Sequence, residues 1–346
     1  MKKKILFINF GGLGDEILFL PTIISIKKEF PDSEITLVLE PRSKGVLSLT
    51  NIIDDVLFAD IKQSVVIPSS RGRVGANLFH NKYIELFNLL RQIWSKKFDI
   101  VISSGSNKFI SMFLFATFIK TRVGYNSGKL SEKLLTQAVT LNKNQYAAKM
   151  YHDLVRGITK YNTELPEINI ERKPAEPNTV LIHPGVSLMS VRKGMIKTIS
   201  AEKWAEVVEK LADNGKKVIL VGGPDDKEVI ETIEKIVPCE KYTNMYGKTR
   251  NLKELAEMIS GAEMFLCSDS APLHVAVALG VKTFVIFGST DDKKLIPDNG
   301  LVIPIKAKNC KCPLQPCLWE RRQTTCETLD CLNISADEIV DVIMEN

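Results

Sequence analysis

One carboxylate stands in a glycine-rich turn near the N-terminus, in a position suited to proton transfer. The turn spans residues 11–15 (GGLGD), and its acidic residue is Asp15. A carboxylate that reaches an acceptor hydroxyl within about 3 Å can remove its proton as a general base. The same residue type also caps helix N-termini, so both roles stay open for Asp15. A dinucleotide-binding fingerprint is excluded, because Ile17 occupies its third glycine position.

A second group of polar residues, at 268–274 (SDSAPLH), has the chemistry of an anion site. Asp269 and Ser270 follow an apolar run, and Pro272 suits the first turn of a helix. Free backbone N–H groups and the positive end of the helix dipole attract anions at such a position. We predict that a departing diphosphate binds here. An N-cap role for Asp269 or Ser270 is the alternative, and it is compatible with that function.

Two more polar loops follow apolar runs in the same half of the chain. The first opens with His183, Pro184 and Gly185 and then brings three cations that suit phosphate oxygens: Arg192, Lys193 and Lys197. The second, residues 221–226 (VGGPDD), offers three carboxylates that could accept hydrogen bonds from ribose hydroxyls: Asp225, Asp226 and the nearby Glu228. Each loop alone could be a solvated turn, but the four loops together indicate a nucleotide-binding enzyme.

Alternating apolar runs and helical segments must position these loops. In the first half we expect strands at 4–10, 34–40, 55–59, 98–103 and 121–125, and a helix at 16–30. In the second half strands at 179–183, 217–221, 264–268 and 283–287 alternate with helices at 201–213, 225–236, 252–260 and 272–279. This order predicts an α/β protein with two doubly wound, Rossmann-like domains facing across a cleft, joined by a proline-bearing linker at 161–178. Ligands are expected outside the carboxyl ends of the strands.

Composition narrows the class of protein. The chain has 346 residues, 45% of them hydrophobic and 25% charged, which is enough for two globular cores. The longest apolar run, residues 109–119, is shorter than the roughly 20 residues of a membrane span, so a core or interfacial helix is expected there. The apolar N-terminal run is broken at Asn9 and lacks a cleavage site. These features predict a soluble, cytoplasmic protein that is at most peripheral to the inner membrane.

Positive charge is concentrated in one block. Residues 61–150 contain fourteen Lys and Arg against three acidic residues, a net charge of +11 in a chain whose total is +5. Such a block attracts a phosphorylated or acidic acceptor, the anionic inner face of a membrane, or nucleic acid. A solvated lysine-rich surface is the plainer alternative for each single residue. Nucleic acid is the least supported partner, because aromatic residues are not interleaved in a recognition motif.

Several segments resemble glycosyltransferase family 9, the lipopolysaccharide heptosyltransferases, over about residues 1–126 and 179–343. The similar segments are residues 10–15 with Leu18 and Pro21, 122–125 (RVGY), Lys197 with Glu202 and Trp204, 246–249 (YGKT), 269–274, 278–280 and 287–290. The resemblance implies the GT-B architecture and inverting, metal-independent transfer of a sugar from a nucleotide-sugar donor, with ADP-heptose the first choice. The acceptor would be a saccharide or a cell-surface glycoconjugate such as the lipopolysaccharide core.

The resemblance also implies roles for individual residues. Asp15 would be the catalytic base, and Lys197 would contact the donor phosphates. With the loop chemistry, the predicted donor-binding residues are Lys197, Asp269, Ser270, Ala271, His274, His183, Gly185, Asp226 and Thr249. The predicted acceptor-binding residues are Gly12, Gly14, Arg71, Arg73 and Arg122. The sequence departs from the family at Asn9, where the family has a basic residue that helps to hold an acidic acceptor sugar.

Domain boundaries follow from the same reading. Residues 1–165 are expected to bind the acceptor and residues 178–334 the donor. Residues 335–346 are expected to form a C-terminal helix that packs back toward the N-terminal domain. Two other functions stay open: another nucleotide-sugar enzyme, such as an epimerase, and a non-catalytic member that binds a nucleotide or carbohydrate.

Five of the seven cysteines crowd the segment 310–331, namely Cys310, Cys312, Cys317, Cys326 and Cys331. In a cytoplasmic protein this clustering suggests a metal site or reduced thiols rather than disulfides. Thiolates could hold a structural zinc or iron ion, although C-x-C is not the usual zinc-finger spacing. Reduced thiols are the default expectation, and no cofactor is expected in catalysis.

Overall fold

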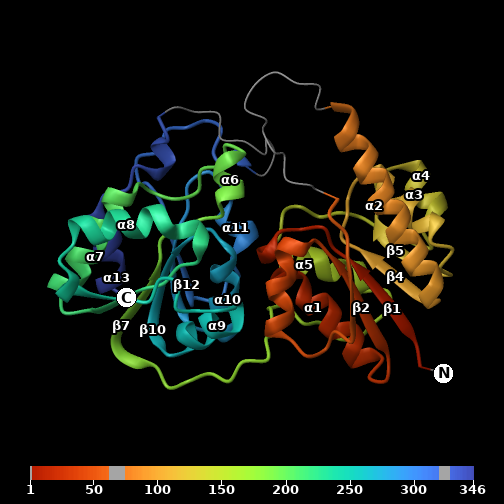
Figure 1. Ribbon diagram of the computed structural model, residues 1–346, viewed down its shortest axis with the longest axis horizontal. Coiled ribbons are helices and arrows are strands. Elements are labelled where there is room, and N and C mark those ends of the chain that lie inside the picture. Colours follow the sequence, from red (N-terminus) through yellow and green to blue (C-terminus); the bar gives the residue numbers. More distant parts are fainter. Residues whose placement is uncertain (1, 62–74, 319–327) are drawn as a thin grey trace. The chain divides into compact units, whose positions relative to one another are not determined.

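The computed structural model describes residues 2–61, 75–318 and 328–346, and it divides the chain into two compact units (Figure 1). The first unit is Met1–Glu167 and the second is Ile168–Asn346. The division falls inside the stretch 161–178, which the sequence analysis predicts as a linker. Each unit contains its own six-stranded parallel sheet.

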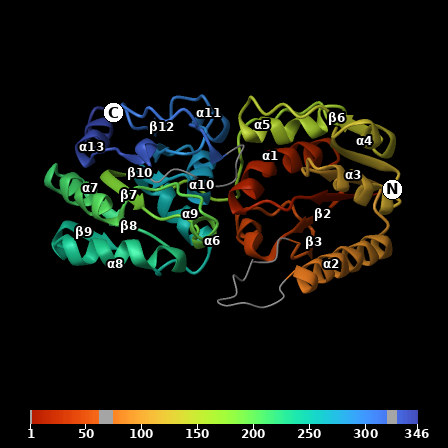
Figure 2. The same cartoon turned by 90° about the horizontal axis from the view of Figure 1, so that it is seen from above.

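The first unit is built on the sheet order β3-β2-β1-β4-β5-β6. Its strands are β1 (Lys4–Ile8), β2 (Glu34–Leu39), β3 (Asp55–Phe58), β4 (Ile100–Ser103), β5 (Thr121–Tyr125) and β6 (Gln137–Val139). Its α-helices are α1 (Leu13–Glu29), α2 (Gly75–Lys96), α3 (Lys108–Ala116), α4 (Lys129–Leu134) and α5 (Ala147–His152), with 3₁₀ segments at Pro41–Leu49 and Asp153–Val155. In both views α1 and α5 cover one face of the sheet and α2, α3 and α4 cover the other (Figures 1 and 2).

The second unit has the sheet order β12-β11-β10-β7-β8-β9. Its strands are β7 (Glu176–His183), β8 (Lys217–Leu220), β9 (Tyr242–Asn244), β10 (Ala262–Ser268), β11 (Lys282–Ile286) and β12 (Val302–Ile305). Its α-helices are α6 (Leu188–Arg192), α7 (Ala201–Asp213), α8 (Lys227–Ile236), α9 (Leu252–Ser260), α10 (Ala271–Leu279), α11 (Asp292–Leu295) and α13 (Ala336–Met344), with 3₁₀ segments at Pro224–Asp226, Cys239–Lys241 and Asp330–Leu332.

Both sheets have the same strand order, 3-2-1-4-5-6, when the strands of each unit are numbered from its own start. This is the doubly wound order in which the first and fourth strands are neighbours and the chain reverses direction across the sheet. The reversal lies between β1 and β4 in the first unit and between β7 and β10 in the second. Ligands of such sheets bind beyond the carboxyl ends of these two strands.

Local sequence explains the elements that frame these sites. The central strands β1 and β10 are buried along almost their whole length, as expected for strands covered on both faces. Helix α7 begins where the Ser200 hydroxyl accepts a hydrogen bond from the Lys203 N–H. Helix α10 has Pro272 in its first turn and ends at Gly280, whose φ of 64° is left-handed. The predicted α/β architecture is therefore confirmed.

The C-terminal helix packs within the second unit. Ile339, Val340 and Ile343 of α13 join the core of the second unit, where the helix packs on α7. Lys210 of α7 forms an ion pair of 2.7 Å with Asp337 of α13. The apolar side of α13 is thus buried within its own unit. The predicted packing of this helix toward the first unit stays a prediction.

Within the described residues, no helix combines the length and the apolar character that crossing a lipid bilayer requires.

Candidate active site

The Asp15 carboxylate is fixed at both oxygens. Oδ2 accepts a hydrogen bond of 2.8 Å from the Gly12 N–H, and Oδ1 accepts one of 3.1 Å from the Tyr151 hydroxyl. Asp15 is half-buried in the first turn of α1, just beyond the carboxyl end of β1. The carboxylate therefore caps its own helix, which is the second role that stayed open for Asp15. Each oxygen still has a further lone pair that can accept a proton from a substrate hydroxyl.

Tyr151, on α5, was not found by sequence reasoning. Its ring packs edge-on against Phe19 of α1 with 5.5 Å between the ring centroids, and this contact aims the hydroxyl at Asp15. Burial, and then the Asp15 carboxylate, raise the pKa of Tyr151 well above its ordinary value of 10.0. The hydroxyl therefore stays protonated and acts as a donor. It is separated from Asp15 by 136 residues, so no local motif could have revealed the pair.

The glycines of the turn bring its backbone close to Asp15. A side chain at Gly11 would place its Cβ 2.3 Å from the Cβ of Asp15, so a larger residue would force the turn apart. Gly12 supplies the N–H that holds the carboxylate, and Gly14 lies in the first turn of α1. These positions agree with a structural need for glycine. The predicted contact of Gly12 and Gly14 with an acceptor stays a prediction.

Asn9 and Ser104 join the two strands at which the first sheet reverses. The Asn9 side chain ends β1 and accepts hydrogen bonds from the Ser104 hydroxyl, at 2.8 Å, and from the Gly11 N–H, at 3.1 Å. Ser104 follows β4. The oxygen of the Asn9 amide is thereby identified, since a backbone N–H can only donate. Asn9 thus stabilises the base of the Asp15 turn with a neutral side chain.

In the second unit, Lys197 and Asp269 form an ion pair of 2.9 Å beside the start of α10. Asp269 is only 4% exposed. Burial by itself raises the pKa of Asp269, but the Lys197 ammonium, assisted by His274, outweighs this and holds the pKa below its ordinary value of 3.8. Asp269 is therefore ionised and positions Lys197, whose side chain is 23% exposed, at the positive end of the helix.

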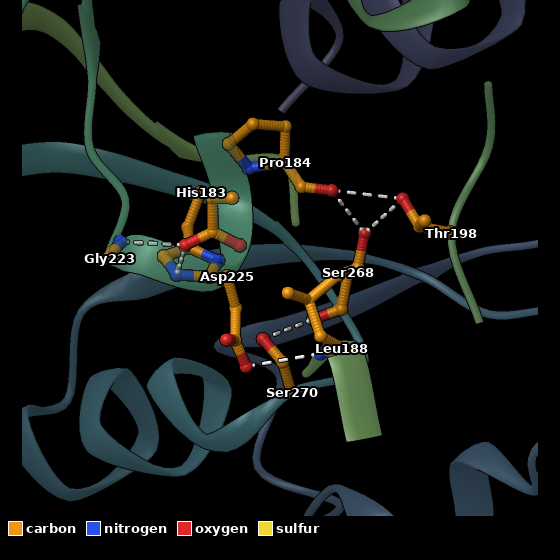
Figure 3. Close-up of polar contacts among 9 residues, drawn as sticks. His183, Pro184, Leu188, Thr198, Gly223, Asp225, Ser268 and Ser270 are labelled. Atoms are coloured by element: carbon orange, nitrogen blue, oxygen red, sulfur yellow. Dashed lines mark hydrogen bonds and ion pairs between the residues drawn. The ribbon is translucent and has the colours of Figure 1, made fainter. Parts of the chain in front are cut away.

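Hydroxyl groups tie the Lys197 loop to the same strand end (Figure 3). The hydroxyls of Ser268 and Thr198 lie 2.7 Å apart, and both lie within hydrogen-bonding distance of the Pro184 carbonyl, at 3.1 and 2.9 Å. The Trp204 indole N–H donates to Thr198 at 2.9 Å. Pro184 follows β7 and Ser268 ends β10, so this network joins the two strands at which the second sheet reverses.

The start of α10 has the chemistry of an anion site. The Ser270 hydroxyl donates to the Ser268 carbonyl at 3.3 Å, and in the described structure it forms no capping bond to the helix. Ala271 is the first residue of α10, and its backbone N–H stands at the positive end of the helix dipole. Lys197, Asp269, Ser270, Ala271 and His274 are thus brought together by one strand end and one helix. Thr249 lies elsewhere, in the turn after the edge strand β9.

Asp226 does not have the predicted position for binding ribose. It is 4% exposed, and its Oδ2 accepts a 2.7 Å hydrogen bond from the Gly223 N–H and lies 3.3 Å from Nε2 of His183. A side chain at Gly185 would place its Cβ only 1.7 Å from Oδ1 of Asp226. Asp226, His183 and Gly185 therefore hold the loops together from inside. Asp225 is the more exposed carboxylate, and it accepts a hydrogen bond of 3.1 Å from the Leu188 N–H (Figure 3).

Arg122 has contacts within the first unit. Its guanidinium donates to the carbonyls of Leu134, at 2.9 Å, and Ile119, at 2.6 Å, and it stacks on the Phe115 ring. These contacts engage Nε and Nη1 of Arg122, and the predicted role of Arg122 in acceptor binding stays a prediction. Arg71 and Arg73 lie outside the described residues.

The cysteines of segment 310–331 do not converge in the part of the chain that the structure describes. Cys310 and Cys312 are partly exposed, whereas Cys317 and Cys331 are buried, and Cys326 lies outside the described residues. Among the described side chains, no group of three or more His, Cys, Asp or Glu is placed to hold a metal ion. The described cysteines therefore do not form the predicted zinc or iron site.

Known proteins place the chain in a family. The sequence model of glycosyltransferase family 9 (heptosyltransferase) matches residues 86–321, more than half of the chain. The chain belongs to glycosyltransferase family 9. The family 9 protein is accordingly a transferase enzyme, and the resemblance stated from its motifs is confirmed.

Individual relatives agree with this assignment. The chain is 24% identical over 291 residues to lipopolysaccharide heptosyltransferase 3 of Escherichia coli (strain K12), which covers 80% of each protein. Its fold is similar to that of a family 9 glycosyltransferase from Veillonella parvula DSM 2008, with a TM-score of 0.75 and 21% identity. The match covers 100% of this chain and 97% of the Veillonella protein. It is also similar to the E. coli heptosyltransferase WaaC with ADP-2-deoxy-2-fluoro heptose, with a TM-score of 0.71, 16% identity and coverage of 99% of each chain. The fold is therefore the two-domain GT-B architecture.

Proposed function

We propose that this glycosyltransferase moves a heptose from ADP-heptose to a saccharide acceptor of the lipopolysaccharide core, by inverting, metal-independent transfer. The proposal rests chiefly on one observation: the Asp15 carboxylate is held in place by the Gly12 N–H and the Tyr151 hydroxyl at the carboxyl end of β1. A carboxylate fixed in this way loses little conformational freedom when it accepts a proton. The relatives support the choice of sugar, since they are heptosyltransferases and one of them holds an ADP-heptose analogue.

The proposed reaction uses groups from both units. An acceptor hydroxyl bound by the first unit attacks the anomeric carbon of the donor, and Asp15 takes the hydroxyl proton. The bond between that carbon and the diphosphate oxygen breaks, and ADP leaves with the negative charge. Lys197 and the backbone N–H groups at the start of α10 stabilise this charge. Because these groups supply positive charge at the leaving group, the proposed mechanism does not require a divalent ion.

Residue roles in the proposal follow the placement of the side chains. We assign Lys197, Ser270 and Ala271 to the donor diphosphate. Asp269 is a positioning residue, because it holds Lys197 from a buried position, and the buried His274 helps to lower the pKa of Asp269. Thr249 is kept as a donor contact from the family resemblance. We propose that the enzyme works in the cytoplasm. We expect it to contact the inner face of the membrane through a surface that does not include these donor-binding residues.

An acceptor-dependence assay tests the proposal. The purified full-length protein is supplied with ADP-heptose, with and without a heptose-free lipopolysaccharide core acceptor, and the release of ADP and the mass of the acceptor are both followed. We expect ADP release only with acceptor, and an acceptor mass increased by one heptose. Turnover of the donor without any acceptor would point instead to an epimerase-like enzyme. Donor binding, followed as a rise in melting temperature, without turnover in either arm would point to a non-catalytic member.

A further inference from the structure

Six exposed aromatic side chains gather on α2, α3 and the residues after α3. They are Tyr83, Phe87 and Trp94 on α2 and Phe109, Phe115 and Phe118 in or after α3, and we call them the α2–α3 patch. Each is between 40% and 78% exposed. Only two other aromatic residues of the described chain, Phe58 and Tyr161, are exposed large hydrophobics. Most of the exposed aromatic side chains among the described residues are therefore carried by α2, α3 and the residues after α3.

The patch is formed by the outer sides of two helices whose inner sides are already packed. On α2, Leu89 and Ile93 are buried in the core of the first unit, while Phe87 and Trp94 point to the opposite side at a helical spacing of seven residues. On α3, Leu114 is buried and Phe115 is exposed. The core therefore does not explain the exposed rings, because each helix already has an apolar side for it.

Contacts between the helices join the patch where α2 and α3 end. The Trp94 indole N–H donates a 3.0 Å hydrogen bond to the Ala116 carbonyl, at the end of α3. The Trp94 and Phe118 rings lie 6.2 Å apart. The Arg122 guanidinium lies over the Phe115 ring, with 5.6 Å between its carbon atom and the ring centroid. These contacts bring Trp94, near the end of α2, beside the end of α3, where aromatic rings and a cation lie together.

Phe118 is held in an unfavourable conformation at the most exposed position of the patch. Its φ of 58° is left-handed, which is rare for a bulky residue, and its side chain is 78% exposed. A turn of this kind would accommodate glycine or asparagine with less strain. An aromatic ring directed into solvent on such a turn indicates a surface that is used for binding.

The surroundings of the patch are cationic. Six basic residues between positions 83 and 133 are exposed: Arg91, Lys97, Lys108, Lys120, Lys129 and Lys133. The same span has three acidic residues. Two of these are engaged: Asp99 accepts the Lys4 N–H, and Glu132 accepts the Asn126 amide. The aromatic rings therefore lie in a field of positive charge.

We propose that the α2–α3 patch binds the surface of an anionic lipid bilayer. Aromatic side chains favour the boundary between water and lipid headgroups, and nearby Lys and Arg are attracted to anionic lipids. A second copy of the chain is a poorer occupant, because two identical patches would bring their cations together. The proposal does not depend on the transferase activity, and it concerns only the first unit.

Vesicle flotation of the full-length protein tests this binding. The vesicles are phosphatidylcholine alone, or phosphatidylcholine with about one part in three of phosphatidylglycerol. We expect flotation with the anionic vesicles only, and less of it at high salt. Two double variants should each weaken this binding by more than about tenfold: Phe109→Ser with Phe118→Asn, and Lys108→Glu with Lys120→Glu. Asparagine is chosen at 118 because it tolerates the left-handed backbone.

A matched control comes from α8 of the second unit, where Lys235→Glu with Ile236→Ser also removes an exposed cation and an exposed hydrophobic residue. This variant should float like the wild type, and all variants should keep the wild-type circular dichroism. The proposal is overturned if the wild type does not float with anionic vesicles, or if both patch variants float as well as it does. It is also overturned if light scattering shows a wild-type dimer that the Phe109/Phe118 variant dissociates, since the patch would then join two copies.

Discussion

The Tyr151 hydroxyl donates a hydrogen bond of 3.1 Å to Oδ1 of Asp15, and so links α5 to the first turn of α1. The opposite oxygen of Asp15 is held by the Gly12 N–H. The proposed base is therefore oriented from two directions, by one local contact and one distant contact. This arrangement allows orientation and basicity to be tested separately.

Removal of the distant contact should slow catalysis without abolishing it. Tyr151→Phe keeps the ring that packs on Phe19 but frees Oδ1 of Asp15, so we expect kcat to fall about tenfold while KM for the donor is unchanged. Steady-state kinetics measure this. Tyr125→Phe is the control, because it removes a buried hydroxyl that donates to the Met150 carbonyl at 2.7 Å and does not contact Asp15. If the two variants lose the same activity, Tyr151 acts through stability alone.

Removal of the carboxylate itself should nearly abolish transfer. Asp15→Asn cannot accept the proton, and kcat should fall by about a hundredfold to ten-thousandfold, with the donor-induced rise in melting temperature retained. The asparagine amide oxygen can still accept from the Gly12 N–H, so the loss of stability should stay below about 1 kcal/mol. Glu338→Gln is a matched control, because Glu338 forms the same kind of capping box with Ser335 in α13. Near-normal turnover of Asp15→Asn would remove Asp15 as the base.

The Lys197–Asp269 pair should control both donor affinity and acid stability. Lys197→Met removes the charge that faces the donor, so KM for the donor should rise. It also leaves a buried carboxylate without its partner, which costs about 3 kcal/mol at neutral pH. Asp269→Asn separates the two effects, because it removes the buried charge but keeps the cation. An unchanged KM in Lys197→Met would show that Lys197 does not bind the donor.

The pH dependence of stability follows from the same pair. In the folded protein the pKa of Asp269 lies below 3.8, its ordinary value, so the unfolded state binds more protons as the pH falls through this range. The pair therefore stabilises the fold fully above about pH 5 and progressively less below about pH 4. Lys197→Met removes the main interaction that opposes the effect of burial, so the pKa of Asp269 should rise and acid unfolding should begin at a higher pH. Urea midpoints between neutral and acidic pH measure the difference.

A methyl group at position 185 should disrupt the loops of the second unit. In Gly185→Ala the new Cβ would lie 1.7 Å from Oδ1 of Asp226, which is held by the Gly223 N–H and cannot move away easily. We expect a loss of about 2–3 kcal/mol and weaker donor binding. Gly223→Ala is the control, since its Cβ would lie 4.0 Å from Oδ2 of the same aspartate. Equal melting temperatures for the two variants would contradict this assignment.

Sequence reasoning found the architecture because local patterns determine it. The apolar strands around residues 5–8 and 264–268 are buried on both faces, and helix α7 begins and ends where its cap and apolar spacing predict. Helix α2 was not predicted. Its apolar residues lie on two sides, buried at Leu89 and exposed at Phe87, so they give no simple amphipathic pattern.

The site was predicted less completely, because its residues meet through the fold. The motifs located Asp15, Lys197 and the start of α10. They could not reveal Tyr151, whose role depends on how α5 packs. They also could not show that Asp226 is buried against Gly185, or that Arg122 donates a hydrogen bond to the Leu134 carbonyl. Residue type and spacing suggest the chemistry of a loop, whereas burial decides which of its side chains reach a substrate.

The repeated strand order has a consequence for how this enzyme loses its structure. Since each half encloses a complete sheet with its own hydrophobic interior, cooperativity need not extend over the whole chain, and heating can melt the halves in separate steps. Calorimetry would then show two transitions, and a nucleotide-sugar would raise only the one that belongs to the half that binds it. The repeated topology therefore makes it possible to assign a ligand to its half of the molecule without a turnover assay.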